Sequence, residues 1–191
     1  MSSFPRWKRT CDLLVGGAGL VLSAIPIALI SAAILFDSGR PIFLRQSRIG
    51  ADGRGYPMWK FRTLPRDTPQ MSKAELQRID IKPTPLGRML RRYSLDEVPQ
   101  LLNVLAGDMT LVGPRPALYT QHDLVTMRRE VGILHARPGM TGLAQISGRE
   151  DLTLEQKVAL DREYVLRMSP LLDASIVLRT ARAVLQARGS R

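Results

Sequence analysis

The chain has 191 residues, and its 28 lysines and arginines against 17 acidic residues give a formal charge of +11. This length fits one domain with a hydrophobic core, and the charge favours an anionic partner such as lipid headgroups, a nucleotide or nucleic acid. Aromatic residues make up only 5% of the chain, and no helix-turn-helix or zinc-finger pattern is present, so nucleic acid is the weakest of these partners. The single cysteine, Cys11, excludes an intramolecular disulfide.

The first predicted element is an apolar segment of 24 uncharged residues from Leu13 to Phe36. As a helix it would measure about 36 Å, which is enough to cross a bilayer. A spanning helix leaves one flank poor in positive charge, yet basic residues lie on both sides: Arg6, Lys8, Arg9, Arg40, Arg45 and Arg48. Pro26 removes a backbone hydrogen bond near the middle, so we expect a sharp bend there, with Ser23 satisfying a freed carbonyl. A re-entrant helix that enters and leaves by one face is favoured, and a kinked spanning helix is the alternative.

The rest of the chain predicts a mixed fold. Two strand-like runs at 41–45 and 56–62 flank a turn-rich stretch and predict a β-hairpin. Residues 64–87 are rich in proline and predict a loop with one short helix at the capping pattern Ser72 to Glu75. Further helices are predicted at 86–93, 94–106, 121–134, 153–168 and 171–186, with a glycine-rich loop at 138–149. The fold class is therefore α+β and mainly helical, with amphipathic surface helices around one core.

Two adjacent carboxylates, Asp96 and Glu97, carry the strongest chemical signal. They follow Ser94 at a predicted helix start, so Ser94 and Glu97 fit a capping box, in which each side chain bonds a free backbone amide. A functional role is equally compatible, because the helix dipole favours an ionised Asp96 that could attack phosphorus or bind a divalent cation. Adjacent helical residues face different directions, so the two carboxylates should have different roles.

Basic residues in rigid or alternating positions predict phosphate contacts. The turn Gly113-Pro114-Arg115-Pro116 fixes the backbone on both sides of one arginine, which lowers the entropy lost when it binds a phosphate; a plain rigid turn is the alternative. On a strand, Lys60 and Arg62 would point to the same side, where both could contact phosphate. The alternative is a half-buried strand whose solvated face simply carries these two basic residues.

Together these residues give the chain a marked likeness to a known family. It resembles the bacterial sugar transferases, specifically the small monotopic phosphoglycosyl transferases that begin glycoconjugate assembly on a polyprenol phosphate. The likeness extends over nearly the whole chain and rests on an ordered set of motifs: Lys8-Arg9 with Asp12, the proline-broken apolar segment, Phe43 to Gly50, Lys60-Phe61-Arg62-Thr63, Ser94 to Gln100, Asn103-Val104, Gly107-Asp108-Met109, Gly113 to Pro116, Arg137 to Gly142 and Gln145 to Arg149.

The resemblance implies a covalent reaction in two steps. Asp96 would attack the sugar-bearing phosphate of a UDP-sugar, releasing UMP, and polyprenol phosphate would then take the phosphosugar from the aspartate. Mg²⁺ would offset the diphosphate charge close to Asp96 and Glu97, and Glu97 would complete the catalytic pair. By the same resemblance the residues expected to contact substrate are Lys60, Arg62, Arg91, Pro114, Arg115, Pro116 and Arg149.

The resemblance also implies a place for the protein. Residues 1–40 would form a re-entrant membrane helix in the bacterial inner membrane, and residues 41–191 a catalytic domain on its cytoplasmic face. Whether the chain forms a homo-oligomer stays open. The alternative function is a non-catalytic, basic scaffold at the membrane surface that binds anionic lipid.

Overall fold

The computed structural model describes residues 4–68, 80–148 and 151–186. The predicted helix at Ser72 to Glu75 lies outside these residues. The helices are α1 (Arg6–Leu22), α2 (Ala24–Ser38), α4 (Pro85–Arg92), α5 (Leu101–Ala106), α6 (His122–Glu130), α7 (Leu143–Ser147), α8 (Leu154–Arg167) and α9 (Pro170–Leu185), with 3₁₀ turns η1 (Ala51–Gly53) and η2 (Leu95–Gln100). The strands are β1 (Phe43–Ile49), β2 (Gly55–Phe61), β3 (Thr110–Val112), β4 (Ala117–Leu118) and β5 (Gly139–Thr141).

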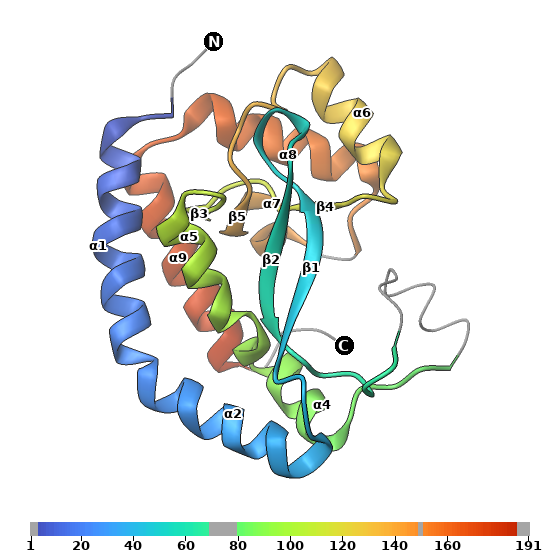
Figure 1. Cartoon of the computed structure of the whole chain (residues 1–191). Helices are drawn as coiled ribbons and strands as arrows, with labels where there is room; N and C mark the ends of the chain where they lie inside the picture. The colour runs from blue at the N-terminus through green and yellow to red at the C-terminus, as the bar shows by residue number, and fades with distance from the viewer. Residues whose placement is uncertain (1–3, 69–79, 149–150, 187–191) are drawn as a thin grey trace.

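The predicted α+β, mainly helical class is confirmed. The β1–β2 hairpin runs through the middle of the molecule, α1 and α2 form an L around one side and the bottom, and α6 and α8 lie at the top (Figure 1). The predicted hairpin is present as an antiparallel pair, to which the short β4 adds on the β1 side. A separate parallel pair, β3 and β5, was not predicted, and β5 and α7 occupy the stretch that composition predicts as a glycine-rich loop.

The apolar segment is broken as predicted, but the break is at Ser23 rather than at Pro26. Pro26 is the third residue of α2, where a missing N–H costs no helical hydrogen bond. Its ring instead clashes with the carbonyl four residues earlier, at Leu22, which is where α1 ends. The Ser23 hydroxyl donates to the Gly19 carbonyl at 2.5 Å, as expected for a residue that stabilises the break. No single described helix is long and apolar enough to cross a membrane, but α1 and α2 together have the required length and composition, with a bend of 54°.

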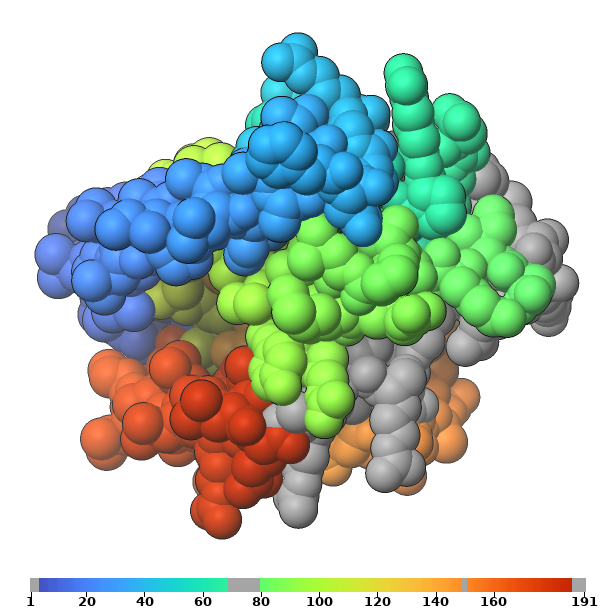
Figure 2. Space-filling model, turned by 90° about the horizontal axis from the view of Figure 1, so that it is seen from below, coloured from blue at the N-terminus to red at the C-terminus, as the bar shows by residue number. Residues whose placement is uncertain are grey.

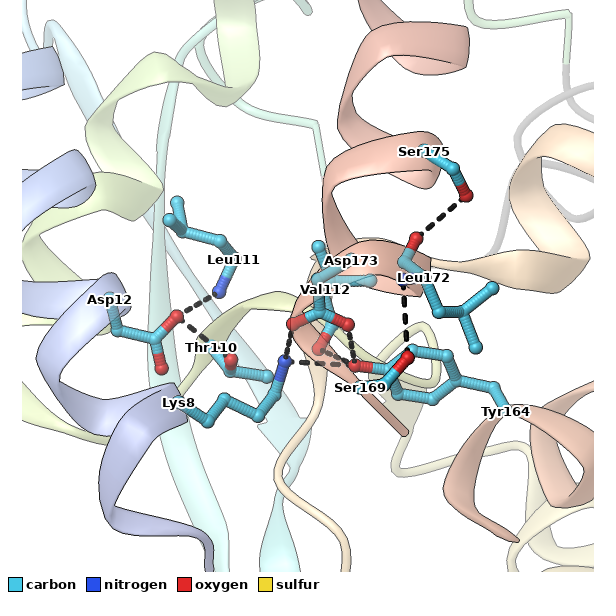
Figure 3. A network of polar contacts seen from close by, with 10 residues as sticks. All are labelled: Lys8, Asp12, Thr110, Leu111, Val112, Tyr164, Ser169, Leu172, Asp173 and Ser175. Atoms are coloured by element: carbon cyan, nitrogen blue, oxygen red, sulfur yellow. Dashed lines mark hydrogen bonds and ion pairs between the residues drawn. The ribbon is translucent and has the colours of Figure 1, made fainter. Parts of the chain in front are cut away.

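Helix α1 packs on the core through small and charged residues. The Cβ positions of Gly16 and Gly19 would lie 3.4 and 3.5 Å from side chains of α5, so these glycines allow the two helices to approach closely. Near its start, the fully buried Lys8 donates to the Tyr164 hydroxyl at 2.8 Å and pairs with Asp173 of α9 (Figure 3). A buried ammonium needs such partners, because an unpaired charge in the interior is strongly destabilising. The N-terminal half of the apolar segment, in α1, is therefore packed on the rest of the folded chain.

Arg62 has a different position from the one predicted for it. The residue follows the last residue of β2, and its guanidinium donates to the carbonyls of Ser38, Gly39 and Pro41 at 2.9, 2.6 and 2.6 Å. Cations stabilise the carbonyl end of a helix, so Arg62 holds the end of α2 against the hairpin. Its described contacts are structural, and they do not place it with the carboxylate pair.

Candidate active site

The carboxylate pair lies on η2, directly after a left-handed residue. Ser94 has φ = 55°, and the following 3₁₀ turn continues into α5, which is capped at its C-terminus by Gly107 with φ = 93°. Pro99 is accommodated within the 3₁₀ turn, which explains why the predicted helix starts in this tighter form. Asp96 is buried, with 8% of its surface exposed.

The predicted capping box is wrong. Within the described part of the chain, the Ser94 side chain makes no cap hydrogen bond. Glu97 instead accepts from Lys60 at 3.0 Å and from Arg115 at 2.9 Å, both on Oε1. Two charged donors bind a carboxylate more strongly than one neutral backbone amide, so the ion pairs take the place of the cap.

The two carboxylates have opposite pKa shifts. Burial raises the pKa of Asp96, and the neighbouring Glu97 adds to this against the opposing charge of Lys60. Burial acts in the same direction on Glu97, but Lys60 and Arg115 outweigh it and hold the pKa of Glu97 well below its ordinary value. The helix start was expected to keep Asp96 ionised; burial instead works against the charged form, because the carboxylate is removed from water. A cation bound beside Asp96 would reverse this.

Stability is expected to depend on pH through Glu97. Its folded-state pKa lies below the ordinary value of 4.5, so its contribution to the free energy of unfolding is fully present above pH 4.5 and is lost as the pH falls towards the folded-state pKa. Glu97→Gln should remove this contribution. Chemical unfolding of both proteins between pH 3 and 7 measures the difference, and a stability difference that stays constant with pH would contradict the assignment.

A third predicted cation, Arg91, lies close to Asp96. Its Nε donates to the Thr63 hydroxyl at 2.8 Å, and its charge lowers the pKa of Asp96. Burial lowers the pKa of Arg91 itself, and Asp96 counteracts that shift. Lys60, Arg91 and Arg115 therefore lie around the carboxylate pair, on β2, on α4 and in the turn before β4, and their contacts with substrate stay a prediction. Arg149 lies outside the described residues, so its role stays a prediction.

The turn at 113–116 is held by its backbone. Its prolines are buried, and the side chain of Arg115 is 49% exposed. Three successive carbonyls of the turn are bound: that of Pro114 by the Gly139 amide at 2.8 Å, that of Arg115 by Arg128 at 2.9 Å, and that of Pro116 by Arg48 at 3.2 Å. Rigidity thus comes from tertiary contacts as well as from proline, and the turn presents Arg115 from a fixed base.

Arg48 and Arg128 are site residues that sequence reasoning missed. Arg128 is buried in an ion pair with Asp161 at 2.5 Å, and its Nη1 donates to the Arg115 carbonyl in the turn. Arg48 lines a narrow cleft that also contains Glu97 and Arg115. Burial and the nearby Arg115 lower the pKa of Arg48 to about 10, so it stays charged at neutral pH. Arg48 lies beyond the predicted strand at 41–45, whereas the observed β1 extends to Ile49, and the direction of its side chain depends on the hairpin register.

The close packing behind this turn depends on glycine. A Cβ atom on Gly139 would lie 2.1 Å from the backbone nitrogen of Gly113, far inside contact distance. We expect Gly139→Ala to lower the free energy of unfolding by roughly 3 kcal/mol, because backbone atoms must move. Gly17→Ala is the matched control, since a Cβ there would have no atom of the described residues within 4 Å. Thermal unfolding of both variants checks this; equal melting temperatures would contradict it.

The carboxylate pair fits a magnesium ion only together with a substrate. Among residues 4–68, 80–148 and 151–186 no group of three or more histidine, cysteine, aspartate or glutamate side chains could hold a metal. Asp96 and Glu97 offer hard oxygen ligands, and Mg²⁺ is usually bound by one or two carboxylates with substrate phosphates and water. The raised pKa of Asp96 marks a buried carboxylate that a cation would stabilise.

Cations outnumber carboxylates in this cluster by three to two, which defines a basic site whose charge suits an anionic, phosphate-like group. Comparisons with known proteins agree. A family model described as bacterial sugar transferase matches residues 3–187. The uncharacterized sugar transferase EpsL of Bacillus subtilis is 38% identical over 95% of this chain and 89% of its own length. The exopolysaccharide production protein ExoY of Rhizobium meliloti is 37% identical over 96% of this chain and 87% of its own length.

A third relative has a name that states a reaction. It is the UDP-glucose:undecaprenyl-phosphate glucose-1-phosphate transferase of Caulobacter vibrioides, 39% identical over 93% of this chain and 69% of the relative. The chain belongs to the bacterial sugar transferase family. The predictions of family and of transferase activity are therefore confirmed.

Proposed function

We propose that the protein transfers a sugar-1-phosphate from a UDP-sugar to polyprenol phosphate, giving polyprenyl-diphosphate-sugar and UMP. This would be the first membrane step in assembling a glycoconjugate such as exopolysaccharide or lipopolysaccharide. The observation that carries the proposal is the buried Asp96 beside Glu97, with Lys60, Arg91 and Arg115 around them. The name of the Caulobacter relative supplies the substrate class.

In the proposed first step an Asp96 oxygen attacks the phosphorus that carries the sugar. The bond from that phosphorus to the bridging oxygen breaks, UMP leaves, and the phosphosugar stays on the aspartate. In the second step an oxygen of polyprenol phosphate attacks the same phosphorus and the bond to Asp96 breaks. The carboxylate is thereby restored and the new diphosphate is complete.

The surrounding residues would stabilise charge in both steps. Lys60, Arg91 and Arg115 would balance the phosphate oxygens, with Arg115 held between Pro114 and Pro116 at the nucleotide. Glu97 keeps its negative charge through its low pKa, so it can orient cations and complete a Mg²⁺ site with Asp96. Bound Mg²⁺ would offset the diphosphate charge.

We further propose that the α1–α2 segment is re-entrant. Residues 1–40 would form the membrane unit and residues 41–191 a catalytic domain on the cytoplasmic face of the bacterial inner membrane. The bend of 54°, and basic residues at both ends, support entry and exit by one face.

The face that contains α2, α4 and α9 supports the same placement. These elements are seen together from below in Figure 2. They expose large apolar side chains, Ile25, Leu29, Phe36, Met89, Leu171, Leu178 and Leu185, and exposed arginines, Arg88, Arg92, Arg179 and Arg182. Apolar side chains beside arginines are typical of helices that lie at an anionic membrane surface.

Cysteine labelling tests the topology. In a Cys11→Ser background, Arg6→Cys and Arg40→Cys place one exposed thiol at each end of the segment. We expect a membrane-impermeant maleimide to label both in inside-out vesicles and neither in intact spheroplasts, because both ends would be cytoplasmic. Labelling from opposite faces would show a spanning segment instead.

UMP release tests the activity. The purified chain with Mg²⁺ and a panel of UDP-sugars should release about one UMP per enzyme without an acceptor and continue turning over when polyprenol phosphate is added. The competing function, a non-catalytic scaffold that binds anionic lipid, predicts binding to anionic vesicles with no UMP from any sugar.

A further inference from the structure

Helix α1 holds two polar side chains against the segments that build the active site. Arg9 donates to the carbonyls of Val104 and Leu105, both at 2.7 Å. These carbonyls belong to the last turn of α5, which continues directly from η2. Arg9 therefore fixes the far end of the segment that carries Asp96 and Glu97.

Asp12 makes the corresponding contact with the other segment. Its Oδ1 accepts from the Leu111 amide and the Thr110 hydroxyl, both at 2.9 Å (Figure 3). The side chain is 1% exposed, and β3 runs from these residues straight into the turn at 113–116. Asp12 thus fixes the strand from which Arg115 is presented.

The two segments meet again at the site, where Glu97 and Arg115 pair at 2.9 Å. We infer that Arg9 and Asp12 are positioning residues. They hold the far ends of the two segments that bring Glu97 and Arg115 together, so the geometry of that pair depends on how α1 packs against α5 and β3. Burying a carboxylate is costly, and the second oxygen of Asp12, Oδ2, is buried without a hydrogen-bond partner among the described residues. The buried carboxylate of Asp12 offsets this cost by holding β3 in position. This inference rests on the proposed function for its catalytic readout.

The kinetics of UMP release in a lipid bilayer test the positioning role of Arg9 and Asp12. The full chain in nanodiscs of phosphatidylethanolamine and phosphatidylglycerol is compared with Asp12→Ala, Asp12→Asn and Arg9→Lys. We expect Asp12→Ala to slow the first turnover of UMP release by about 10- to 100-fold, since small misplacements of catalytic groups have effects of this size. Asp12→Asn keeps the accepting oxygen and should restore most of the rate. Thr10→Ala is the matched control, because Thr10 is exposed on the same turn and its hydroxyl donates to the Arg6 carbonyl within α1.

A thermal double-mutant cycle separates positioning from general destabilisation. Independent sites have additive effects, so coupling between Asp12→Ala and Arg115→Met would support a shared geometry. Additive melting temperatures, or Asp12→Asn no faster than Asp12→Ala, would overturn the inference. If Asp12→Ala does not fold, Arg9→Lys takes its place, since one ammonium cannot keep both carbonyls in the same geometry. If the wild-type chain releases no UMP with any sugar, the proposed function fails. The thermal double-mutant cycle would still show whether Asp12 and Arg115 are coupled.

Discussion

Asp96→Asn is expected to abolish UMP release and the labelled protein adduct together. The amide is nearly isosteric with the carboxylate but is a far weaker nucleophile, so the first bond to phosphorus does not form. Loss of a nucleophile in enzymes with covalent intermediates costs roughly 10⁴- to 10⁶-fold in rate. The measurement is single-turnover UMP release with a UDP-sugar labelled in its sugar, followed by denaturing separation of the protein.

The fold should survive this change. Burial already raises the pKa of Asp96, so a neutral side chain at this position removes a desolvated charge rather than a stabilising one. Asp123→Asn is the matched control, because Asp123 also lies in a first helical turn but is exposed on α6. An undiminished adduct in Asp96→Asn, or equal losses in both variants, would refute the covalent role of Asp96.

Glu97→Gln is expected to lower kcat/KM by about 10²- to 10³-fold, the loss typical of removing one charged group from a preorganised site. The reason differs from that for Asp96. Glu97 is the common partner of Lys60 and Arg115, whose side chains are 14% and 49% exposed. Without its charge the two cations repel each other and the more exposed Arg115 can move away. Adduct formation should slow but remain detectable.

A second substitution isolates this effect. Lys60→Met in the Glu97→Gln background removes the unpaired, partly buried cation, so the double variant should lose less stability than the two single losses added together. Kinetics with the UDP-sugar and thermal unfolding are measured on all four proteins. Additive losses would mean that Lys60 and Glu97 act independently despite their 3.0 Å contact.

The sequence was sufficient for features that depend on nearby residues. The charge-free run with Pro26 predicted a broken helix, and two strand-like runs around a glycine-rich turn predicted the hairpin. Both follow from local backbone preferences, which proline, glycine and alternating patterns express directly. Asp96, Glu97 and Arg115 could be singled out for the same reason, since they stand in short and distinctive motifs.

Position within those elements was less predictable. The break falls at Ser23 because a proline disturbs the carbonyl four residues before it, so its own position is not where the chain bends. Arg62 could be read only as the next basic residue after Lys60. Its role at the end of α2 required knowing that a helix 24 residues earlier in the chain returns to the hairpin.

Tertiary structure alone decided the partners of the charged groups. By sequence, Glu97 fits a cap with Ser94; in the fold it pairs with Lys60 and Arg115, which are 37 and 18 residues away. Arg48 of β1 and Arg128 of α6 both bind the turn at 113–116, although they belong to other elements of the chain. A local pattern records which side chains could bond, but the choice among partners depends on which cations the fold brings close and how far burial removes water from them. The sequence by itself thus determined the family, the fold class and the candidate catalytic residues, and the folded chain decided what each of those residues touches.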